Sequence, residues 1–376
     1  MSQDALATEL PAVLQQAENL PSLPAVALEV LRLTQSDETT LDDLASTLAM
    51  DPALSAKLLR LSNSSAFSMG SEVTTLQRAC MVLGLKTVKL MALSFSLAGT
   101  FREGDAGAFD YDQFWRRSAI CAAAGRFIAG RTNRSVADEA FLCGLLARIG
   151  QLVAARCMPR PYGRLVEAVA PRWPSSEQEE EALGFNGEDV VVALMQSWSM
   201  PSAFALALAH RRGPCGLPED ADEHVVALCR ASALAWACEE FLCGADKAGA
   251  KERLDRFALE HFGYDGDAVE ELLVELQGEI AETGRLLDVD VGKLDVAGMI
   301  AQAQSQLVQV SLGVAIENKQ AERERTILTT KNKELADKAH TDKLTGLPNR
   351  ARFDELMAAC VQERVAGTAD KALGLL

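Results

Sequence analysis

The sequence predicts an all-α protein. Aromatic residues make up only 5% of the 376 residues, whereas Ala and Leu are plentiful, and this composition favours closely packed helices over sheets. Apolar residues recur at helical spacing in one segment after another. No segment before about residue 315 shows the strict alternation that is typical of a β-strand.

The first hundred residues predict a series of short helices. Two prolines fix the start of the first, in "LPSLPAVALEVLRLTQ". Thr40 and Asp43 have the spacing of a capping box at the start of the second helix, and Asp51 followed by Pro52 begins the third. Gly84 separates the two helices predicted after these.

Longer helices are predicted from Tyr111 onward. The segment "DQFWRRSAICAAAGRFIAGRT" predicts one helix, and "SVADEAFLCGLLARIGQLVAARC" predicts another, for which Ser135 is the candidate cap. Acidic residues at the start of "SSEQEEEALGF" suit the positive end of a helix dipole. Further helices are expected in "EDVVVALMQSWSM", "PSAFALALAHRR", "HVVALCRASALAWACEEFL" and "AVEELLVELQGEIAETGRLL".

The bulk composition limits the partners and the compartment. The formal net charge is −16, and so acidic a surface repels phosphate backbones and anionic lipids, which argues against nucleic acid and the membrane surface as partners. The longest apolar stretches, such as residues 90–101, are shorter than the roughly 20 residues of a membrane-spanning helix. "MSQDALATEL" has neither the basic start nor the apolar run of a signal peptide, so we expect a cytoplasmic protein.

The nine cysteines predict buried free thiols. They are scattered and form no CxxC pair, which argues against a disulfide framework or a zinc site. Most lie within apolar helical patterns, as Cys80, Cys121, Cys143 and Cys229 do.

A polar segment follows the predicted bundle. "NKQAERERTILTTKNKELADKAHTD" contains neither Gly nor Pro, and its apolar residues continue a seven-residue spacing. The seam consists of Ile300, Leu307, Val314, Ala321, Leu328 and Leu335. The positions three residues further on are apolar only at Ala303 and Val310 and are charged from Glu317 onward. Two interpretations stay open: a parallel two-stranded coiled coil that joins a homodimer, or a single solvated linker helix.

Six stretches between about Leu10 and Leu287 together resemble the HDOD family, a helical relative of the HD phosphohydrolases. They are "LPSLPAV", "DPALSAKLLRLSNSSAFS", "TTLQRACMVLGLKTVKLMALS", "FWRRSAICAAA", "FLCGLLARIGQL" and "SWSMPSAFALALAHRR". The resemblance implies an N-terminal HDOD subdomain over residues 1–108 and an HD-like helical subdomain over residues 109–297.

A second resemblance follows the linker, which we place at residues 298–340. The segment "HTDKLTGLPNRARFDEL" is similar to the opening of a GGDEF domain, the α+β module of diguanylate cyclases. The residues that carry it are Asp342, Leu344, Thr345, Gly346, Leu347, Pro348, Asn349 and Arg350. The resemblance implies that an incomplete GGDEF domain occupies residues 341–376, and that a coiled coil commonly leads into it.

The resemblance to HD hydrolases also allows a test for metal chemistry. Those enzymes hold one or two divalent metals with histidines and aspartates, and the metals generate the hydroxide nucleophile. Their ligand positions fall at or near Arg117, Ala147, Arg148, Gly187 and His210. Because an arginine repels a metal ion, we expect no metal and no catalytic residue here. Arg148 then either pairs with an acidic neighbour or lies in a cavity that binds a small ligand.

The GGDEF resemblance implies chemistry that this chain does not complete. Such a domain joins two GTP molecules held on facing subunits and uses magnesium held by acidic residues. "KALGLL", residues 371–376, resembles the start of its first strand, and no GGDEF or GGEEF run is present. Magnesium and GTP are therefore expected only for a complete domain.

The sequence thus predicts a signal-transduction protein. An HDOD module without catalysis senses or docks a signal, which is a protein partner or a small molecule, and regulates a C-terminal diguanylate cyclase. Two other hypotheses stay open. One is a protein-interaction scaffold without catalysis, and the other is a metal-dependent phosphohydrolase with unusual ligands.

Overall fold

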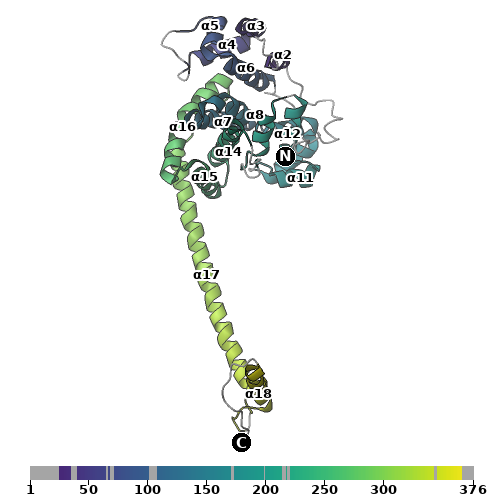
Figure 1. The fold of residues 1–376 in the computed structure, drawn as a ribbon, viewed down its shortest axis with the longest axis vertical. Helices are drawn as coiled ribbons and strands as arrows, with labels where there is room; N and C mark the ends of the chain where they lie inside the picture. The colour runs from purple at the N-terminus through teal and green to yellow at the C-terminus, as the bar shows by residue number, and fades with distance from the viewer. Residues whose placement is uncertain are drawn as a thin grey trace. The chain divides into compact units, whose positions relative to one another are not determined.

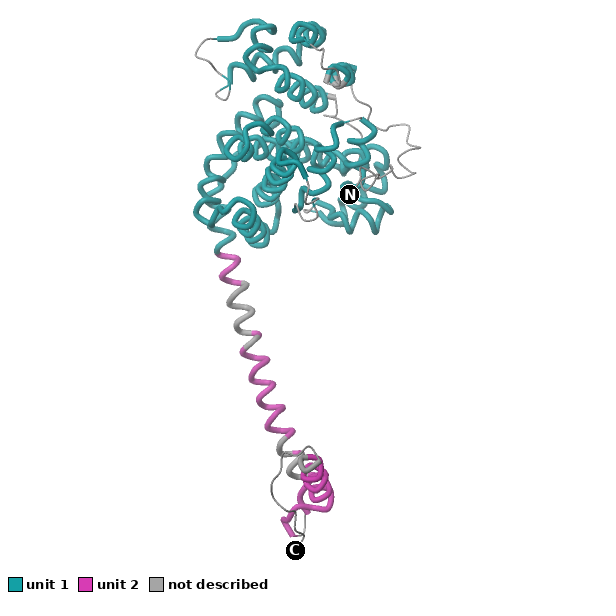
Figure 2. The backbone as a smooth tube through the Cα atoms, viewed as in Figure 1, with its two compact units in different colours: residues 1–304 teal, residues 305–376 magenta. Residues whose placement is uncertain are grey.

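The computed structural model describes residues 25–34, 40–64, 67, 72–100, 108–170, 173–198, 200–213, 217, 221–342 and 345–365. Within these ranges every regular element is a helix, and the only β-type pairing is an isolated bridge between Thr341 and Pro348. The chain divides into two units, residues 1–304 and 305–376 (Figure 2). The prediction of an all-α fold is confirmed. A boundary near residue 108 stays a prediction.

The first five described helices pack as a small group. They are α2 (Ala25–Thr34), α3 (Leu41–Leu48), α4 (Pro52–Ser62), α5 (Leu76–Leu83) and α6 (Leu85–Thr100) (Figure 1). Helix α6 packs against α2 and α4, and α3 packs against α5. Leu44, Leu58 and Met91 are fully buried among them. The start "LPSLP" of the predicted first helix lies outside the described residues.

Local side-chain chemistry sets the ends of these helices. The Thr40 hydroxyl accepts a hydrogen bond from the amide of Asp43 at 3.2 Å, and the Asp43 carboxylate accepts one from the amide of Thr40 at 3.0 Å. The Asp51 carboxylate accepts from the amide of Leu54 at 3.0 Å. Gly84 separates α5 from α6 with a φ of +80°, which an L side chain rarely adopts. These three predicted helix boundaries are confirmed.

The second group of helices surrounds α7 (Tyr111–Thr132), which packs against α8, α14 and α16 (Figure 1). The others are α8 (Ala137–Leu146), α9 (Ile149–Cys157), α10 (Pro159–Val169), α11 (Ser176–Leu183), α12 (Gly187–Ser197), α13 (Ser202–Ala209), α14 (Glu223–Cys243), α15 (Lys247–Phe262) and α16 (Gly266–Leu287). A Cβ atom on Gly144 of α8 would overlap the backbone at Cys121 of α7. Small residues therefore let α7 and α8 approach closely, as their composition predicts.

The prediction of one helix from Ser135 to Cys157 was wrong in two respects. The segment from Ser135 to Cys157 forms two helices, α8 and α9, separated by a turn at Ala147 and Arg148. Ser135 does not cap α8, because the preceding short 3₁₀ helix takes its cap from Asn133. The break was invisible in the sequence because apolar residues continue through it and neither turn residue is Gly or Pro.

The same stretch is long and apolar enough to cross a membrane by length and composition alone. However, 89% of its most apolar window is buried within the fold. Phe141 and Leu142 of α8 and Leu152 of α9 belong to the main hydrophobic core. This burial is what the core helices of a folded domain show.

Helix α15 was not among the predicted helices. Its buried face consists of three alanines, Leu254 and the stem of Lys251. So little apolar surface gives only a weak helical periodicity in the sequence.

The second unit contains most of α17 (Val296–His340) and α18 (Arg350–Val365). The start of α17 belongs to the first unit, where Val296, Ile300 and Ala303 are buried in the core. Helix α18 begins directly after the GGDEF-like residues, whereas the strand predicted at residues 371–376 lies outside the described residues.

Candidate functional site

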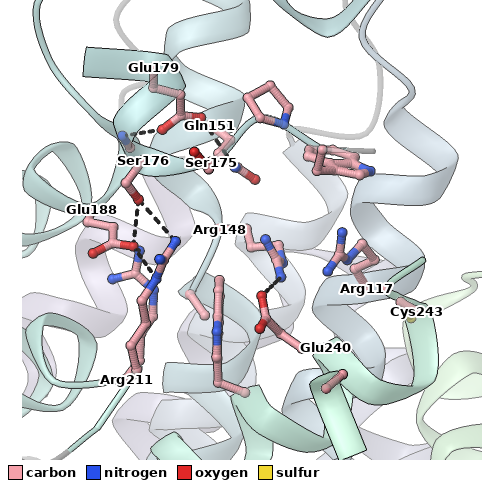
Figure 3. A pocket seen from close by; sticks show the side chains of 18 of the residues that line it. Arg117, Arg148, Gln151, Ser175, Ser176, Glu179, Glu188, Arg211, Glu240 and Cys243 are labelled. Atoms are coloured by element: carbon pink, nitrogen blue, oxygen red, sulfur yellow. Dashed lines mark hydrogen bonds and ion pairs between the residues drawn. The ribbon is translucent and has the colours of Figure 1, made fainter. Parts of the chain in front are cut away.

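A cavity of about 430 Å³ opens in the first unit where α7, the α8–α9 turn, α12 and α14 meet. Four of the five positions expected from the HD comparison line it: Arg117, Ala147, Arg148 and Gly187. The fifth, His210, does not line it, but the next residue does. The arginines of the lining are Arg117, Arg148, Arg211, Arg212 and Arg253, and we call the site the arginine cavity (Figure 3).

Two of these arginines share one buried carboxylate. Arg117 donates through Nε to Oε1 of Glu239, and Arg148 donates through Nη2 to Oε2 of Glu239 at 2.6 Å. Glu239 lies on α14 and is 0% exposed, while both arginines are 6% exposed. Burial alone raises the pKa of Glu239, but the charges and hydrogen bonds of the two guanidinium groups outweigh it and hold this pKa below its usual value.

The expected pairing of Arg148 with an acidic neighbour is therefore confirmed, and Glu239 is the partner. The pairing does not fill the space, because the arginine cavity persists beside it. The two alternatives left open by the sequence are thus compatible. Arg148 is paired, and room for a small ligand remains.

Arg211 lies deep in the same cavity and is 4% exposed. It donates from Nη1 to the carbonyl of Leu208 at 2.6 Å and approaches Oε1 of Glu188 with Nη2 at 3.5 Å. The same Glu188 oxygen forms an ion pair with Nε of Arg212 at 2.6 Å and accepts a hydrogen bond from the Ser176 hydroxyl at 2.7 Å. Burial lowers the pKa of Arg211 to about 10 although Glu188 acts in the opposite direction.

Trp236 contacts both Arg148 and Arg211. The guanidinium carbons of Arg148 and Arg211 lie 4.0 Å and 5.0 Å from the centre of its ring. A cation over the face of an indole ring is attracted by the negative potential of that face. The ring therefore holds both guanidinium groups at one side wall of the arginine cavity.

Glu179 joins α11 to the start of α12. Its carboxylate accepts from the amide of Gly187 at 2.7 Å, from the hydroxyl of Tyr162 at 3.0 Å and from the side-chain amide of Gln151 at 3.2 Å. Burial raises the pKa of Glu179, and these hydrogen bonds oppose that effect. This carboxylate caps a helix and is satisfied within the wall of the cavity.

No group of three or more His, Cys, Asp or Glu side chains is placed to hold a metal ion within the part of the chain that the structure describes. Cys80, Cys121, Cys143 and Cys229 are buried and free, as predicted. Cys243 lines the arginine cavity, and burial raises the pKa of its thiol to about 12, which keeps it protonated near neutral pH.

The GGDEF-like positions form the connection between α17 and α18. The Asp342 carboxylate accepts from the amide and hydroxyl of Thr345 at 2.9 and 2.8 Å, and Gly346 has a φ of +70°. Asn349 donates to the carbonyl of Ala339 at 2.6 Å and accepts from the amide of Arg352 at the start of α18. Leu347, Pro348 and Arg350 are also described there, whereas Leu344 lies outside the described residues.

Among the described side chains of the linker seam, Ile300 is buried in the first unit and the residues from Ala321 onward are exposed. Leu328 and Leu335 are 59% and 60% exposed, Ala321 is exposed, and Leu307 is half-buried. Nothing is said of Val314, whose side chain lies outside the described residues.

Sequence reasoning missed Glu239, Trp236, Glu188 and Arg212 as functional candidates. Glu239 was detectable in principle, because it is a carboxylate within the largely apolar segment "ALAWACEEFL". A charge on the buried face of a core helix requires a partner. The identity of that partner depends on residues far away in the sequence.

Comparisons with known proteins relate part of the chain to a family. The HDOD domain model matches residues 20–214. A Treponema pallidum (strain Nichols) protein described as uncharacterized is 24% identical over 191 residues, which is 50% of this chain and 37% of that protein. The chain therefore spans little more than a third of the length of that curated relative.

Several solved structures are similar to the chain, among them the following three. A protein of Shewanella amazonensis SB2B named as a candidate phosphohydrolase is 26% identical, with 73% of this chain and 98% of that chain covered and a TM-score of 0.56. An HDOD domain protein of unknown function from Geobacter sulfurreducens is 20% identical, with coverages of 80% and 96% and a TM-score of 0.52. A candidate signal transduction protein of Marinobacter aquaeolei VT8 is 21% identical, with coverages of 77% and 68% and a TM-score of 0.53. The last two show the fold alone.

Proposed function

The chain belongs to the HDOD family, and from this premise we propose that it is a cytoplasmic signal-transduction protein whose HDOD module binds a signal without hydrolysing it. By HDOD module we mean the helices of residues 1–297. We further propose that this module regulates a C-terminal diguanylate cyclase, of which the present chain holds the opening.

The observation that carries the first part is the pairing of Arg117 and Arg148 with Glu239. Two guanidinium groups occupy positions where the resemblance to HD enzymes implies metal ligands. They are fixed by a buried carboxylate rather than free to move aside. A divalent cation at this place meets two fixed positive charges, which opposes metal-dependent hydrolysis.

The cyclase part rests on the residues from Asp342 to Arg350 and on the linker before them. A diguanylate cyclase joins two GTP molecules across two subunits, so its activity depends on how the subunits face each other. A helical linker with two exposed leucines seven residues apart, Leu328 and Leu335, offers a way to bring two chains together. A signal bound to the HDOD module can then shift the population of active dimers.

The mass of the native protein tests the cyclase part. We expect immunoprecipitation and mass spectrometry to find a product heavier than the 40.4 kDa of this chain by a further domain. GTP turnover of that product, with and without the HDOD module, then measures regulation. A native product of 40.4 kDa contradicts the cyclase proposal and favours an interaction scaffold.

A second candidate function is metal-dependent phosphohydrolysis. The similarity to the Shewanella amazonensis protein favours it, because that protein is named as a candidate phosphohydrolase. Metal analysis of the purified chain discriminates the two. Stoichiometric manganese or iron supports the hydrolase. Tighter metal binding in an Arg148→Ala variant would tie the metal to the arginine cavity, because that variant removes a charge that repels a cation there. Substoichiometric metal supports a binding module.

A further inference from the structure

We propose that the arginine cavity binds a small phosphate-bearing molecule through the guanidinium groups of Arg148, Arg211 and Arg212. This inference rests on the proposed function, because it names the chemical class of the signal that the HDOD module binds. It requires no metal and no reaction.

The charges of the inner cavity favour an anion. Arg117, Arg148 and Arg211 are almost completely buried, and Arg212 stands beside them at the cavity wall. Against these four cations the inner wall offers the buried carboxylate of Glu239 and the half-buried carboxylate of Glu188, each already shared by two arginines. Glu179 is a third carboxylate in this wall, so four guanidinium groups face three carboxylates. The inner cavity therefore holds more positive than negative charge.

The arginines also act on one another. After burial and the attraction of Glu188, the charges of Arg212 and Arg148 both lower the pKa of Arg211. Like charges held together in a region of low dielectric raise the energy of the empty site. A dianion placed among them relieves this repulsion, because one tetrahedral phosphate can accept hydrogen bonds from several guanidinium groups.

Unused hydrogen-bonding groups point to the same conclusion. Nε of Arg148, Nε of Arg211 and Oε1 of Gln151 are buried and have no hydrogen-bond partner among the described residues. Arg148 uses only Nη2 for Glu239. Buried polar groups are nearly always paired, so the two unpaired Nε–H donors indicate a missing acceptor. Oε1 of Gln151 is itself an acceptor, which an anion does not satisfy. Figure 3 shows the side chains of Arg148 and Arg211 within this wall.

The mouth of the cavity leaves room for the rest of the ligand. Glu240 and Asp246 lie there and approach Arg253 at 3.8 Å and 3.9 Å, and Glu240 also lies 3.9 Å from Nη2 of Arg148. Arg253 and Asp246 are exposed, and Glu240 is partly exposed, so these side chains are largely hydrated and their charges are screened. A volume of about 430 Å³ suits a small organic phosphate rather than a single inorganic ion.

Calorimetry with pyrophosphate tests this proposal on the whole 376-residue chain. We expect saturable 1:1 binding in EDTA buffer, tighter than the binding of citrate at the same ionic strength. EDTA removes metal ions, so binding that persists in EDTA depends on the guanidinium groups and not on a metal ion. Absence of binding at millimolar pyrophosphate, loss of binding in EDTA, or tighter binding of citrate overturns the proposal.

Matched variants locate the binding. We expect Arg211→Gln and Arg212→Gln each to weaken pyrophosphate binding at least tenfold. The control Arg131→Gln removes the same charge on α7 at an exposed pair with Glu275 and should bind as the unchanged chain does. Arg212 is exposed, so its variant should fold even if the Arg211 variant does not. Unchanged affinity in Arg212→Gln overturns the proposal.

This binding is independent of the C-terminal domain. If pyrophosphate binds but the native product has a mass of 40.4 kDa, the cyclase proposal fails and the anion site stands. If the native product is a cyclase but the chain binds no pyrophosphate, the anion site fails and the cyclase proposal stands.

Discussion

The arginine cavity and the linker differ in the kind of side chain that each buries or exposes. In the cavity, charged groups are buried and pair with one another within the chain. Glu239 from α14 forms ion pairs with Arg117 from α7 and with Arg148 from the α8–α9 turn. In the linker, apolar groups are exposed, and among the described side chains Leu328 and Leu335 remain 59% and 60% exposed. Buried charge demands an internal partner, whereas exposed apolar surface at regular spacing points to an external one.

This difference predicts which property of the chain a substitution in each region changes. Substitutions in the cavity should change the stability of the fold itself, because several helices meet there. Substitutions in the linker should change association and leave the fold of the first unit intact. Four predictions test this contrast, in order of decreasing effect on the free energy of unfolding.

Glu239→Gln should have the largest effect. It leaves the side-chain volume unchanged but removes the charge that pairs two buried guanidinium groups. Breaking a buried ion pair on one side typically costs about 3–5 kcal/mol, so we expect a loss of that size in the free energy of unfolding. Urea denaturation followed by circular dichroism measures it.

The neighbouring carboxylate provides the control. Glu240 is partly exposed and lies 3.9 Å from Arg148, so Glu240→Gln should cost less than about 1 kcal/mol. Equal effects of the two variants would contradict the assignment of Glu239 as the central counterion.

Gly150→Ala should have the next largest effect. A Cβ atom at this position on α9 would overlap the backbone carbonyl of Gly187 at the start of α12. Because the obstacle is backbone, we expect a loss of about 1–3 kcal/mol in the free energy of unfolding. The control is Gly130→Ala on α7, where nothing lies within 4 Å and a more helix-prone residue should be neutral or stabilising. Destabilisation by both variants alike would contradict close packing of α9 on α12.

Lowering the pH should reduce the contribution of Glu239 to the free energy of unfolding. The pKa of Glu239 is lowered in the folded chain, so its contribution to stability is present above the pKa of the unfolded chain, about 4.3. The contribution is lost as the pH falls through the lower pKa of the folded state. We therefore expect the difference in the free energy of unfolding between the unchanged chain and the Glu239→Gln variant to decrease below about pH 4. A gap that is constant from pH 7 to pH 3 would contradict this.

Local features of the fold could be predicted from the sequence, because local chemistry determines them. The capping box at Thr40, the start of α4 at Asp51 and the separation of α5 from α6 at Gly84 each depend on a few neighbouring residues. The break at Ala147 and Arg148 could not be predicted, because it reflects how α9 packs on α12 rather than a local signal.

The candidate site was predictable only in part. A buried Arg148 needs a counterion, and that requirement follows from electrostatics alone. The partner could not be identified, because Glu239 lies 91 residues after Arg148 and 122 residues after Arg117. The position expected near His210 was displaced by one residue, since Arg211 rather than His210 lines the cavity. Neighbouring residues at the end of a helix point in different directions, and sequence spacing does not determine which of the two faces the cavity.

The smallest effect on folding is expected from the linker. Leu328→Asp combined with Leu335→Asp replaces two exposed seam residues, so the free energy of unfolding of the first unit should change by less than about 0.5 kcal/mol. The same variant should reduce the mass in light scattering from dimer to monomer, because charges facing each other across a coiled-coil seam repel. Ile327→Asp is the matched control, since Ile327 is 62% exposed but lies outside the seven-residue seam. If the unchanged chain is already a monomer at micromolar concentration, the coiled-coil interpretation is wrong and α17 is a solvated linker. If Ile327→Asp also dissociates the dimer, association does not follow the seven-residue seam.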